Sequence, residues 1–292
     1  MIISFLSGGL GNQLFQYAMG KSISERKKQD LFFDIQSFGW DDLRSFELNK
    51  IGIHYPIATS EEVNHIKNLP KSLLEKIASK FGQNLPYYKK SFIKEVDFVF
   101  DINFRYFRNR NVYLEGYWQS ENYFKDIRPY LLNEIRFENL TTKTYYYKNI
   151  IESHSESVSI HVRRGDYASN PDTTNFHGLM NKTYYLQAIQ LITSKLDNPY
   201  FFVFSDDKEF VKTMFEGFDN IEFIEGLTYD YEDLHLMSLC KHQIIANSSF
   251  SWWGAWLNRN ERKQIIAPKQ WFHDEEMQSK TTDLIPSSWI KI

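Results

Sequence analysis

The sequence has 292 residues, which is enough for one large domain or two smaller ones with a sizeable core. Hydrophobic residues make up 42% and charged residues 24%, a composition typical of a globular protein. The formal net charge is −3, so no overall basic field attracts nucleic acid, and no nucleic-acid partner is expected. The single cysteine, Cys240, excludes an intrachain disulfide and a cysteine-based zinc site.

Residues 1–35 have the pattern of a β-α-β unit. The apolar run IISFL is followed by the glycine-rich turn SGGLGN, an amphipathic helix and a second apolar run, DLFFDI. Gly9 and Gly11 fit the start of the G-x-G-x-x-G dinucleotide fingerprint, but Leu14 stands where the third glycine is needed. Asp34 ends the second strand where a ribose-binding acid would lie. NAD(P) binding is therefore one alternative, and a simple strand-to-helix turn is another.

The rest of the chain divides into a polar stretch and a regular alternation. Between residues 60 and 110 the sequence is polar and lysine-rich, which predicts one or two amphipathic helices. Residues 112–124, VYLEGYWQSENYF, predict a strand that ends in an aromatic loop. After about residue 155 strands and helices alternate, which predicts a parallel sheet. We expect a boundary near residues 150–155, with two α/β halves facing each other across a cleft, and neither a signal peptide nor a membrane span.

The stretch VSIHVRRGDY (158–167) is an apparent strand that ends in charge. Val158, Ile160 and Val162 alternate on one face, and His161, Arg163 and Arg164 follow on the other face and at the end. Ligands of parallel α/β sheets bind outside the carboxyl ends of the strands, so the arginine pair predicts an anion site. The alternative is a surface ion pair with Asp166.

Two further strand ends are polar. FFVFSDDKEF places Ser205, Asp206 and Asp207 after a strand; Asp206 and Glu209 have the spacing of a helix capping box, and a carboxylate here could also accept the N–H donors of guanine. QIIANSSFSWWGAWL places small polar residues before an aromatic helix, where they could cap it or hold phosphate. We expect its tryptophans to be structural: Trp252, Trp253 and Trp256.

YDYEDLH (229–235) contains Asp230, Glu232 and Asp233, which loosely resemble the D-x-D pattern of metal-dependent sugar transferases. The same spacing suits acids in the first turn of a helix, where they complement the dipole, and we favour that interpretation. No metal site is predicted, so the positive charge of the site would come from the arginines.

Five segments, taken in order, resemble the α-1,2-fucosyltransferases of bacterial and animal origin: GGLGNQLFQYA (8–18), LEGYWQSENYF (114–124), HVRRGDY (161–167), FSDD (204–207) and ANSSFSWWGAWL (246–257). The resemblance extends from near residue 1 to about residue 272. It implies an α/β fold of the glycosyltransferase-B type, with two Rossmann-like halves facing a cleft. Residues 1–154 would form the acceptor side, and residues 155–292 would bind the GDP-sugar.

The resemblance implies transfer of L-fucose from GDP-β-L-fucose to the 2-hydroxyl of a terminal β-galactoside, with inversion and without a metal or other cofactor. Other activities stay open: another GDP-sugar donor such as GDP-mannose, another galactoside linkage, an NAD(P)-dependent enzyme, or a glycan-binding module without turnover. The animal members have an N-terminal membrane anchor, and we expect none in this protein. We therefore expect a bacterial, cytoplasmic enzyme of polysaccharide or O-antigen biosynthesis, acting at the inner face of the membrane on a free or lipid-linked oligosaccharide, with peripheral membrane contact.

Residue roles follow from the matched motifs. Arg163 matches the arginine on the β-phosphate and His161 the histidine near the nucleotide sugar; Asp206 or Asp207 matches the guanine partner. The base that takes the acceptor proton is expected to be Asp166, which could equally serve only to orient Arg164. The alternatives are Glu115, His161 and an unassisted attack with late loss of the proton. The residues expected to be catalytic are Asn12, His161, Arg163, Arg164 and Asp166. Those expected to bind substrate are Gly9, Gly11, Gln13, Tyr117, Trp118, Gln119, Ser205, Asp206, Asp207, Asn247, Ser248, Ser249, Phe250 and Ser251.

Overall fold

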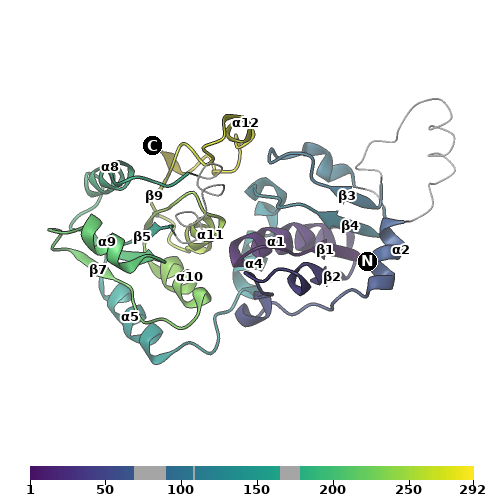
Figure 1. The fold of residues 1–292 in the computed structure, drawn as a ribbon, viewed down its shortest axis with the longest axis horizontal. Helices are drawn as coiled ribbons and strands as arrows, with labels where there is room; N and C mark the ends of the chain where they lie inside the picture. Colours follow the sequence, from purple (N-terminus) through teal and green to yellow (C-terminus); the bar gives the residue numbers. More distant parts are fainter. Residues whose placement is uncertain (69–89, 108, 165–177) are drawn as a thin grey trace. The chain divides into compact units, whose positions relative to one another are not determined.

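The computed structural model describes residues 1–68, 90–107, 109–164 and 178–292. The chain forms two compact units, Met1–Arg136 and Phe137–Ile292. Each contains a parallel sheet with helices, which confirms the predicted α/β class (Figure 1). The division falls before the expected boundary because helix α5 (Thr142–Ser153) packs against α10 (Asp230–Leu239) in the second unit.

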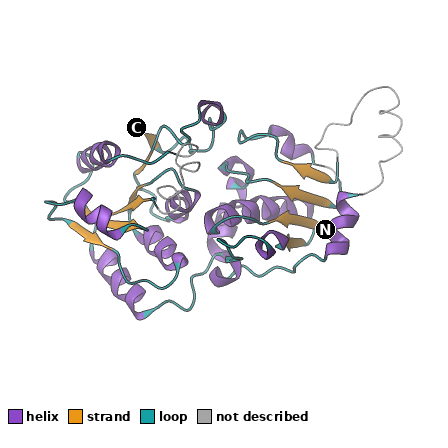
Figure 2. Cartoon of the chain, viewed as in Figure 1, coloured by secondary structure: helices purple, strands orange, loops and turns teal. Residues whose placement is uncertain are grey.

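The first unit is built on a four-stranded parallel sheet in the order β2-β1-β4-β3. Its strands are drawn in orange in Figure 2, and α1 runs alongside β1. Leu14 and Ile23, on the apolar side of this helix, are fully buried. The strands are β1 (Ile2–Phe5), β2 (Leu31–Asp34), β3 (Phe92–Lys94) and β4 (Val112–Glu115). The α-helices are α1 (Leu10–Lys27), α2 (Ser60–Lys67) and α4 (Arg128–Glu134), with 3-10 helices at Gln36–Gly39, Leu48–Ile51, Ile102–Tyr106, Glu121–Tyr123 and Lys125–Ile127.

The second unit has a six-stranded parallel sheet in the order β10-β9-β8-β5-β6-β7. In chain order this is 6-5-4-1-2-3, the strand order of dinucleotide-binding folds, and it reverses between β5 and β8. The strands are β5 (Ser157–Val162), β6 (Tyr200–Ser205), β7 (Ile221–Phe223), β8 (His242–Ile244), β9 (Ile265–Ala267) and β10 (Ile290–Lys291). The remaining helices are α8 (Lys182–Thr193), α9 (Lys208–Met214), α11 (Ser249–Leu257) and α12 (Glu275–Ser279). The reversal makes the carboxyl ends of β5 and β8 the expected ligand-binding edge.

The core of the second unit explains the apolar alternation of β5. Val158, Ile160 and Val162 are buried in one cluster with residues of α8, β6 and β8. The tryptophans of α11 are buried as predicted, and Trp252 stacks on Trp256 with ring centroids 6.0 Å apart. Cys240 is fully buried as well, consistent with a small core residue.

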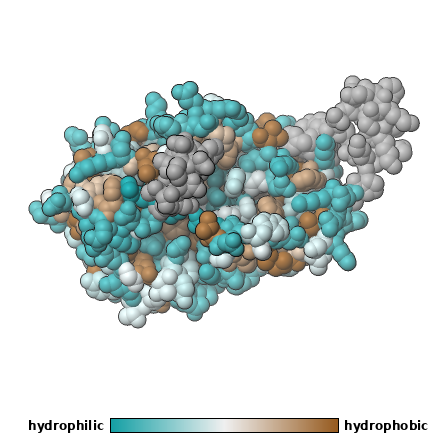
Figure 3. Space-filling model, in the orientation of Figure 1, coloured by the Kyte–Doolittle hydropathy of each residue, from teal (hydrophilic) through white to brown (hydrophobic). Residues whose placement is uncertain are grey.

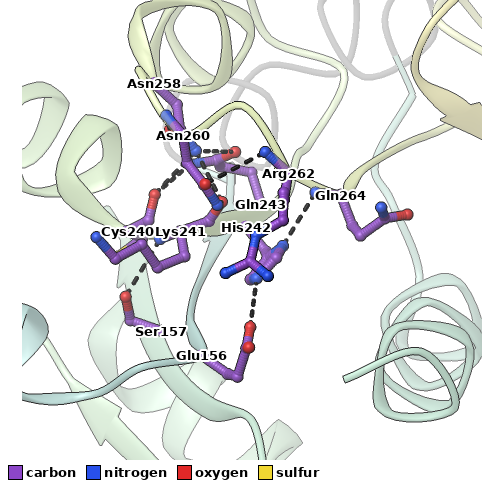
Figure 4. Close-up of polar contacts among 10 residues, drawn as sticks. All are labelled: Glu156, Ser157, Cys240, Lys241, His242, Gln243, Asn258, Asn260, Arg262 and Gln264. Carbon is purple, nitrogen blue, oxygen red and sulfur yellow. Dashed lines mark hydrogen bonds and ion pairs between the residues drawn. The ribbon is translucent and has the colours of Figure 1, made fainter. Parts of the chain in front are cut away.

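A polar network holds the opposite, amino-terminal edge of this sheet (Figure 4). His242, the first residue of β8, contacts Glu156 Oε2 through Nε2 at 2.7 Å, and its Nδ1 accepts the backbone N–H of Gln264 at 3.0 Å. Asn258 donates its amide to the Gln243 side chain at 3.0 Å. Because His242 is buried, its ring nitrogens need these partners. The bonds connect the starts of three neighbouring strands, β5, β8 and β9.

Among the helices in the described part of the chain, none combines the length and apolarity needed to cross a membrane. On the face drawn in Figure 3, hydrophobic residues are scattered among hydrophilic ones.

Candidate functional site

The carboxyl end of β5 presents Arg163, which is held by Asp206 from the end of β6. Arg163 Nη1 lies 2.5 Å from Asp206 Oδ2, and the other carboxylate oxygen accepts the backbone N–H of Arg164 at 2.8 Å. Both side chains are about a quarter exposed, with 24% of Arg163 and 26% of Asp206 accessible. The two predicted strand ends are therefore brought together, and the aspartate fixes both the backbone and one guanidinium at the switch point.

Arg164 is held by a different set of contacts. Its Nε lies 3.0 Å from Asp207 Oδ2, and its Cζ lies 3.7 Å from the centre of the Phe210 ring. Asp207 also caps α9 by accepting the N–H of Phe210 at 3.1 Å, and its own N–H donates to Ser205 Oγ at 3.1 Å. The expected cap at Asp206 was wrong, because the helix begins one residue later than the spacing predicted.

These contacts engage both carboxylates of the 204–207 segment with arginines. The guanine-binding role of Asp206 or Asp207 stays a prediction, and the structure adds an orienting role for both. Asp166, expected as the base and as a partner of the arginines, lies outside the described residues. Among the described groups, Asp207 is the carboxylate that orients Arg164.

His161 lies at the same edge, on the face of β5 opposite the apolar cluster. Its side chain is buried, and Nδ1 has no hydrogen-bond partner among the described residues. Burial lowers the pKa of His161 to about 4, although the charge of Asp206 acts in the opposite direction. The imidazole is therefore neutral near pH 7, where it can orient a ligand but is a weak base.

The first turn of α11 lies beside His161. The ring centroids of Phe250 and His161 are 5.7 Å apart. Ser248 is the N-cap residue, and its side chain makes no capping hydrogen bond. Ser249 and Phe250 are partly exposed, whereas Ser251 is buried and its Oγ accepts the N–H of Ala246 at 3.0 Å. The unpaired N–H groups of a helix N-terminus and its dipole favour an anion at this position.

Asn247 has a structural task in this loop. It is buried, and its Nδ2 donates to the Trp271 carbonyl at 3.1 Å and to the Gly178 carbonyl at 3.3 Å. It therefore anchors the segment from β8 to α11, and the serines after it are better placed to meet a ligand.

In the first unit, the glycine-rich turn meets the aromatic loop that follows β4. Gly8 adopts φ +73°, Gly9 is the N-cap residue of α1, and Gly11 is buried in its first turn. Gln119 Nε2 donates to Asn12 Oδ1 at 3.0 Å. The two segments predicted to bind substrate in this unit are thus joined at the carboxyl edge of its sheet.

Gln13 is buried and acts within the fold. Its Nε2 donates to the carbonyls of Gly8 and Ser45, both at 2.8 Å, and its Oε1 accepts the N–H of Glu47 at 2.9 Å. These bonds hold the 45–47 segment against the glycine turn. The same segment brings in Arg44, which the sequence did not reveal: a Cβ at Gly9 would lie 3.9 Å from Arg44 Nη1.

The aromatic loop contains one exposed and one buried ring. Tyr117 is 41% exposed, whereas Trp118 is buried and its indole N–H has no partner among the described residues. Both backbone N–H groups donate to the carboxylate of Glu95, a residue that sequence reasoning missed. Glu115, one candidate base, is paired with Lys94 at 2.9 Å.

Two alternative sites lose support from the contacts. Asp34, the possible ribose ligand, accepts a hydrogen bond from the hydroxyl of Tyr113 at 2.7 Å and one from the N–H of Gln36 at 3.1 Å, and it is buried.

Glu232, in the acidic segment 229–235, is also buried. Burial raises its pKa, but hydrogen bonds from the hydroxyl of Thr144 and other groups bring the pKa down to about 2. In the described ranges, no group of three or more His, Cys, Asp or Glu side chains could hold a metal. The acids of α10 thus serve the start of that helix, as we favoured.

Comparison with known proteins identifies the family of the chain. The family described as "Glycosyl transferase family 11" matches residues 1–292. An α-1,2-colitosyltransferase of Escherichia coli is 35% identical over 309 residues, covering 100% of this chain and 99% of the relative. The O-antigen biosynthesis glycosyltransferase WbnK of Escherichia coli is 34% identical over 310 residues, covering 99% of each. Among solved structures, the fucosyltransferase NodZ from Bradyrhizobium is 15% identical with a TM-score of 0.47, covering 87% of this chain and 91% of NodZ. The chain belongs to glycosyl transferase family 11.

Proposed function

We propose that this glycosyltransferase transfers L-fucose from GDP-β-L-fucose to the 2-hydroxyl of a terminal β-galactoside, with inversion and without a metal. The observation that carries the proposal is the cationic strand end at the switch point of the second sheet. Arg163 is held there by Asp206, and the first turn of α11 lies beside the same strand end. A guanidinium and free N–H groups at one place suit a pyrophosphate.

The chemistry requires charge stabilisation on the leaving group. As the bond between the sugar and the β-phosphate breaks, the sugar gains positive charge and the phosphate gains negative charge. Arg163 and the N–H groups of Ser249 and Phe250 would stabilise the phosphate charge without reorganisation, because the fold already holds them in place. This supports leaving-group stabilisation as the main source of catalysis.

A base would take the proton of the acceptor hydroxyl. His161 is a weak base because burial holds its pKa at about 4, and Glu115 is paired with lysines. Asp166 remains the proposed base, and Asp166→Asn tests it. A near-normal rate in this variant would remove Asp166 from the reaction and favour late loss of the proton to solvent.

The relatives support the proposed α-1,2 linkage and suggest a second candidate donor. The first relative is an α-1,2-colitosyltransferase, so its name agrees with the linkage proposed here and differs in the sugar. Colitose is L-fucose without its 3-hydroxyl, so both donors would present the same diphosphate to Arg163. GDP-colitose is therefore the second candidate. The name of the other relative refers to O-antigen biosynthesis. We therefore propose that the acceptor is an O-antigen-type oligosaccharide, free or lipid-linked, at the cytoplasmic face of the membrane.

The first experiment measures GDP release from GDP-fucose, GDP-colitose and GDP-mannose, each with and without lactose and in excess EDTA. We expect acceptor-dependent release with GDP-fucose that survives the chelator, and an α-1,2-linked product by NMR. A higher kcat/KM with GDP-colitose would change the donor and keep the reaction. GDP binding without release for any donor and any terminal β-galactoside would overturn the proposed transfer.

A further inference from the structure

A carboxylate and two backbone N–H groups form a compact unit at the carboxyl edge of the first sheet. Glu95 directly follows β3, and Gly116 directly follows the neighbouring strand β4. Glu95 Oε2 accepts the N–H of Tyr117 at 2.6 Å, and Oε1 accepts the N–H of Trp118 at 2.9 Å. Successive N–H groups that converge on one anion form a backbone nest. Glu95 therefore fixes the turn that carries both aromatic residues.

The turn is tightly constrained. A Cβ at Gly116 would lie 2.3 Å from Glu95 Cβ and 2.8 Å from its Oε2, so only glycine fits. Trp118 adopts φ +57°, a costly conformation for a bulky residue, and its buried ring packs edge-on against Tyr123 at 5.5 Å. Such a conformation persists only where its surroundings enforce it. Between these two fixed points lies Tyr117.

Tyr117 is held in one orientation and is still accessible. Its ring is parallel to that of Phe98, with an angle of 8° and centroids 6.1 Å apart, while 41% of the residue remains exposed. Two residues further along, Gln119 donates its amide to Asn12. A pyranose ring has an apolar face of C–H groups and a rim of hydroxyls, so an aromatic surface followed by side-chain amides matches its chemistry.

We propose that Tyr117, backed by Phe98, binds the galactose ring of the acceptor and that Glu95 is the positioning residue for this platform. The inference rests on the proposed function, because it names the part of the chain that receives the β-galactoside. The binding of the acceptor should therefore depend on the Glu95 turn, whereas the binding of GDP should not.

The ionisation of Glu95 gives the proposal a second readout. Burial raises the pKa of Glu95 to about 7; the two backbone N–H groups lower it, and the charge of Asp97 raises it. Among the described residues near this edge, Glu115 pairs with both Lys94 and Lys67. Protonation places a hydrogen on an oxygen that now accepts an N–H, so we expect the turn to loosen and the acceptor KM to rise below about pH 7.

The test compares Tyr117→Ala, Tyr117→Phe and Glu95→Gln with two controls on exposed residues of the second unit, Tyr145→Ala and Glu138→Gln. We expect Tyr117→Ala to raise the acceptor KM by about five- to twentyfold with the donor KM unchanged. The phenylalanine variant should keep most of the affinity. In Glu95→Gln the acceptor KM should be raised at pH 8, and the rise at lower pH seen in the wild type should be absent.

Binding measured without a donor separates this inference from the proposed function. Saturation-transfer NMR with methyl β-galactoside should show contact with the wild type and a weaker signal with Tyr117→Ala, even if no tested donor is used. An unchanged signal in Tyr117→Ala, with circular dichroism confirming the fold, would overturn the platform. An acceptor KM within twofold of the wild type for both Tyr117→Ala and Glu95→Gln would overturn it too.

Discussion

Asp206 spans the gap between two neighbouring strand ends: its Oδ2 lies 2.5 Å from Arg163 Nη1, and its Oδ1 accepts the Arg164 N–H at 2.8 Å. One carboxylate thus sets both the backbone and the guanidinium at the switch point. A planar guanidinium binds a phosphate bidentately only when its plane is correctly oriented. We interpret Asp206 as the group that supplies this orientation.

We expect substitutions of Arg163 and Asp206 to reduce activity to different extents. Arg163→Ala should reduce kcat by roughly a hundred- to a thousandfold, the usual cost of losing a donor to developing negative charge. Asp206→Asn keeps the shape but loses the charge, and we expect a reduction of about ten- to a hundredfold, typical of a residue that orients a ligand-binding group. Steady-state GDP release measures both, with Glu138→Gln as the control. Equal activity of Asp206→Asn and the wild type would contradict the orienting role.

The strands that carry this site could be predicted because their residues are buried in a regular pattern. β5 alternates Val158, Ile160 and Val162 toward one core, and the charged end of the strand follows directly. The sequence could not show which polar groups meet. The pattern placed Arg163 and Asp206 at two strand ends of one predicted sheet, but it did not show that they form an ion pair.

The short elements and isolated charges were beyond sequence reasoning. β3 has three residues and β10 has two, too few to show a period. Glu95 and Arg44 belong to no recognisable motif, and their importance comes from contacts with segments distant in sequence. Parallel pairing of β3 with β4 is what brings Glu95 to the Tyr117 turn.

His161 should remain neutral throughout the physiological range. Its folded-state pKa is about 4, below the value of about 6.5 expected in the unfolded chain, so the unfolded state takes up the proton first as the pH falls. Its contribution to the free energy of unfolding is then constant above pH 6.5 and declines between pH 6.5 and 4. Histidine-selective NMR, with His161→Gln to assign the signal, measures the pKa. A midpoint above pH 6 would contradict the expected neutral state.

The network in Figure 4 predicts a loss of stability with little effect on chemistry. His242→Phe removes the acceptor of the Gln264 N–H and the partner of Glu156, and unpaired buried groups typically cost about 1–3 kcal/mol in the free energy of unfolding. Glu156→Gln keeps an acceptor for Nε2 and should cost less. Urea unfolding measures both. Because the network lies at the amino edge of the sheet, the kcat of the folded His242→Phe protein should match that of the wild type.

Gly116 offers a test of the acceptor-side turn that changes only one carbon. In Gly116→Ala the new methyl would meet Glu95 Cβ at 2.3 Å, a distance that real Cβ atoms do not tolerate, so the strand ends must separate. We expect the free energy of unfolding to fall by about 1–3 kcal/mol and the acceptor KM to rise more than the donor KM. Gly39→Ala is the matched control, since a Cβ there meets nothing within 4 Å. Equal effects of the two alanines on the acceptor KM would show that the Glu95 contact does not shape the turn.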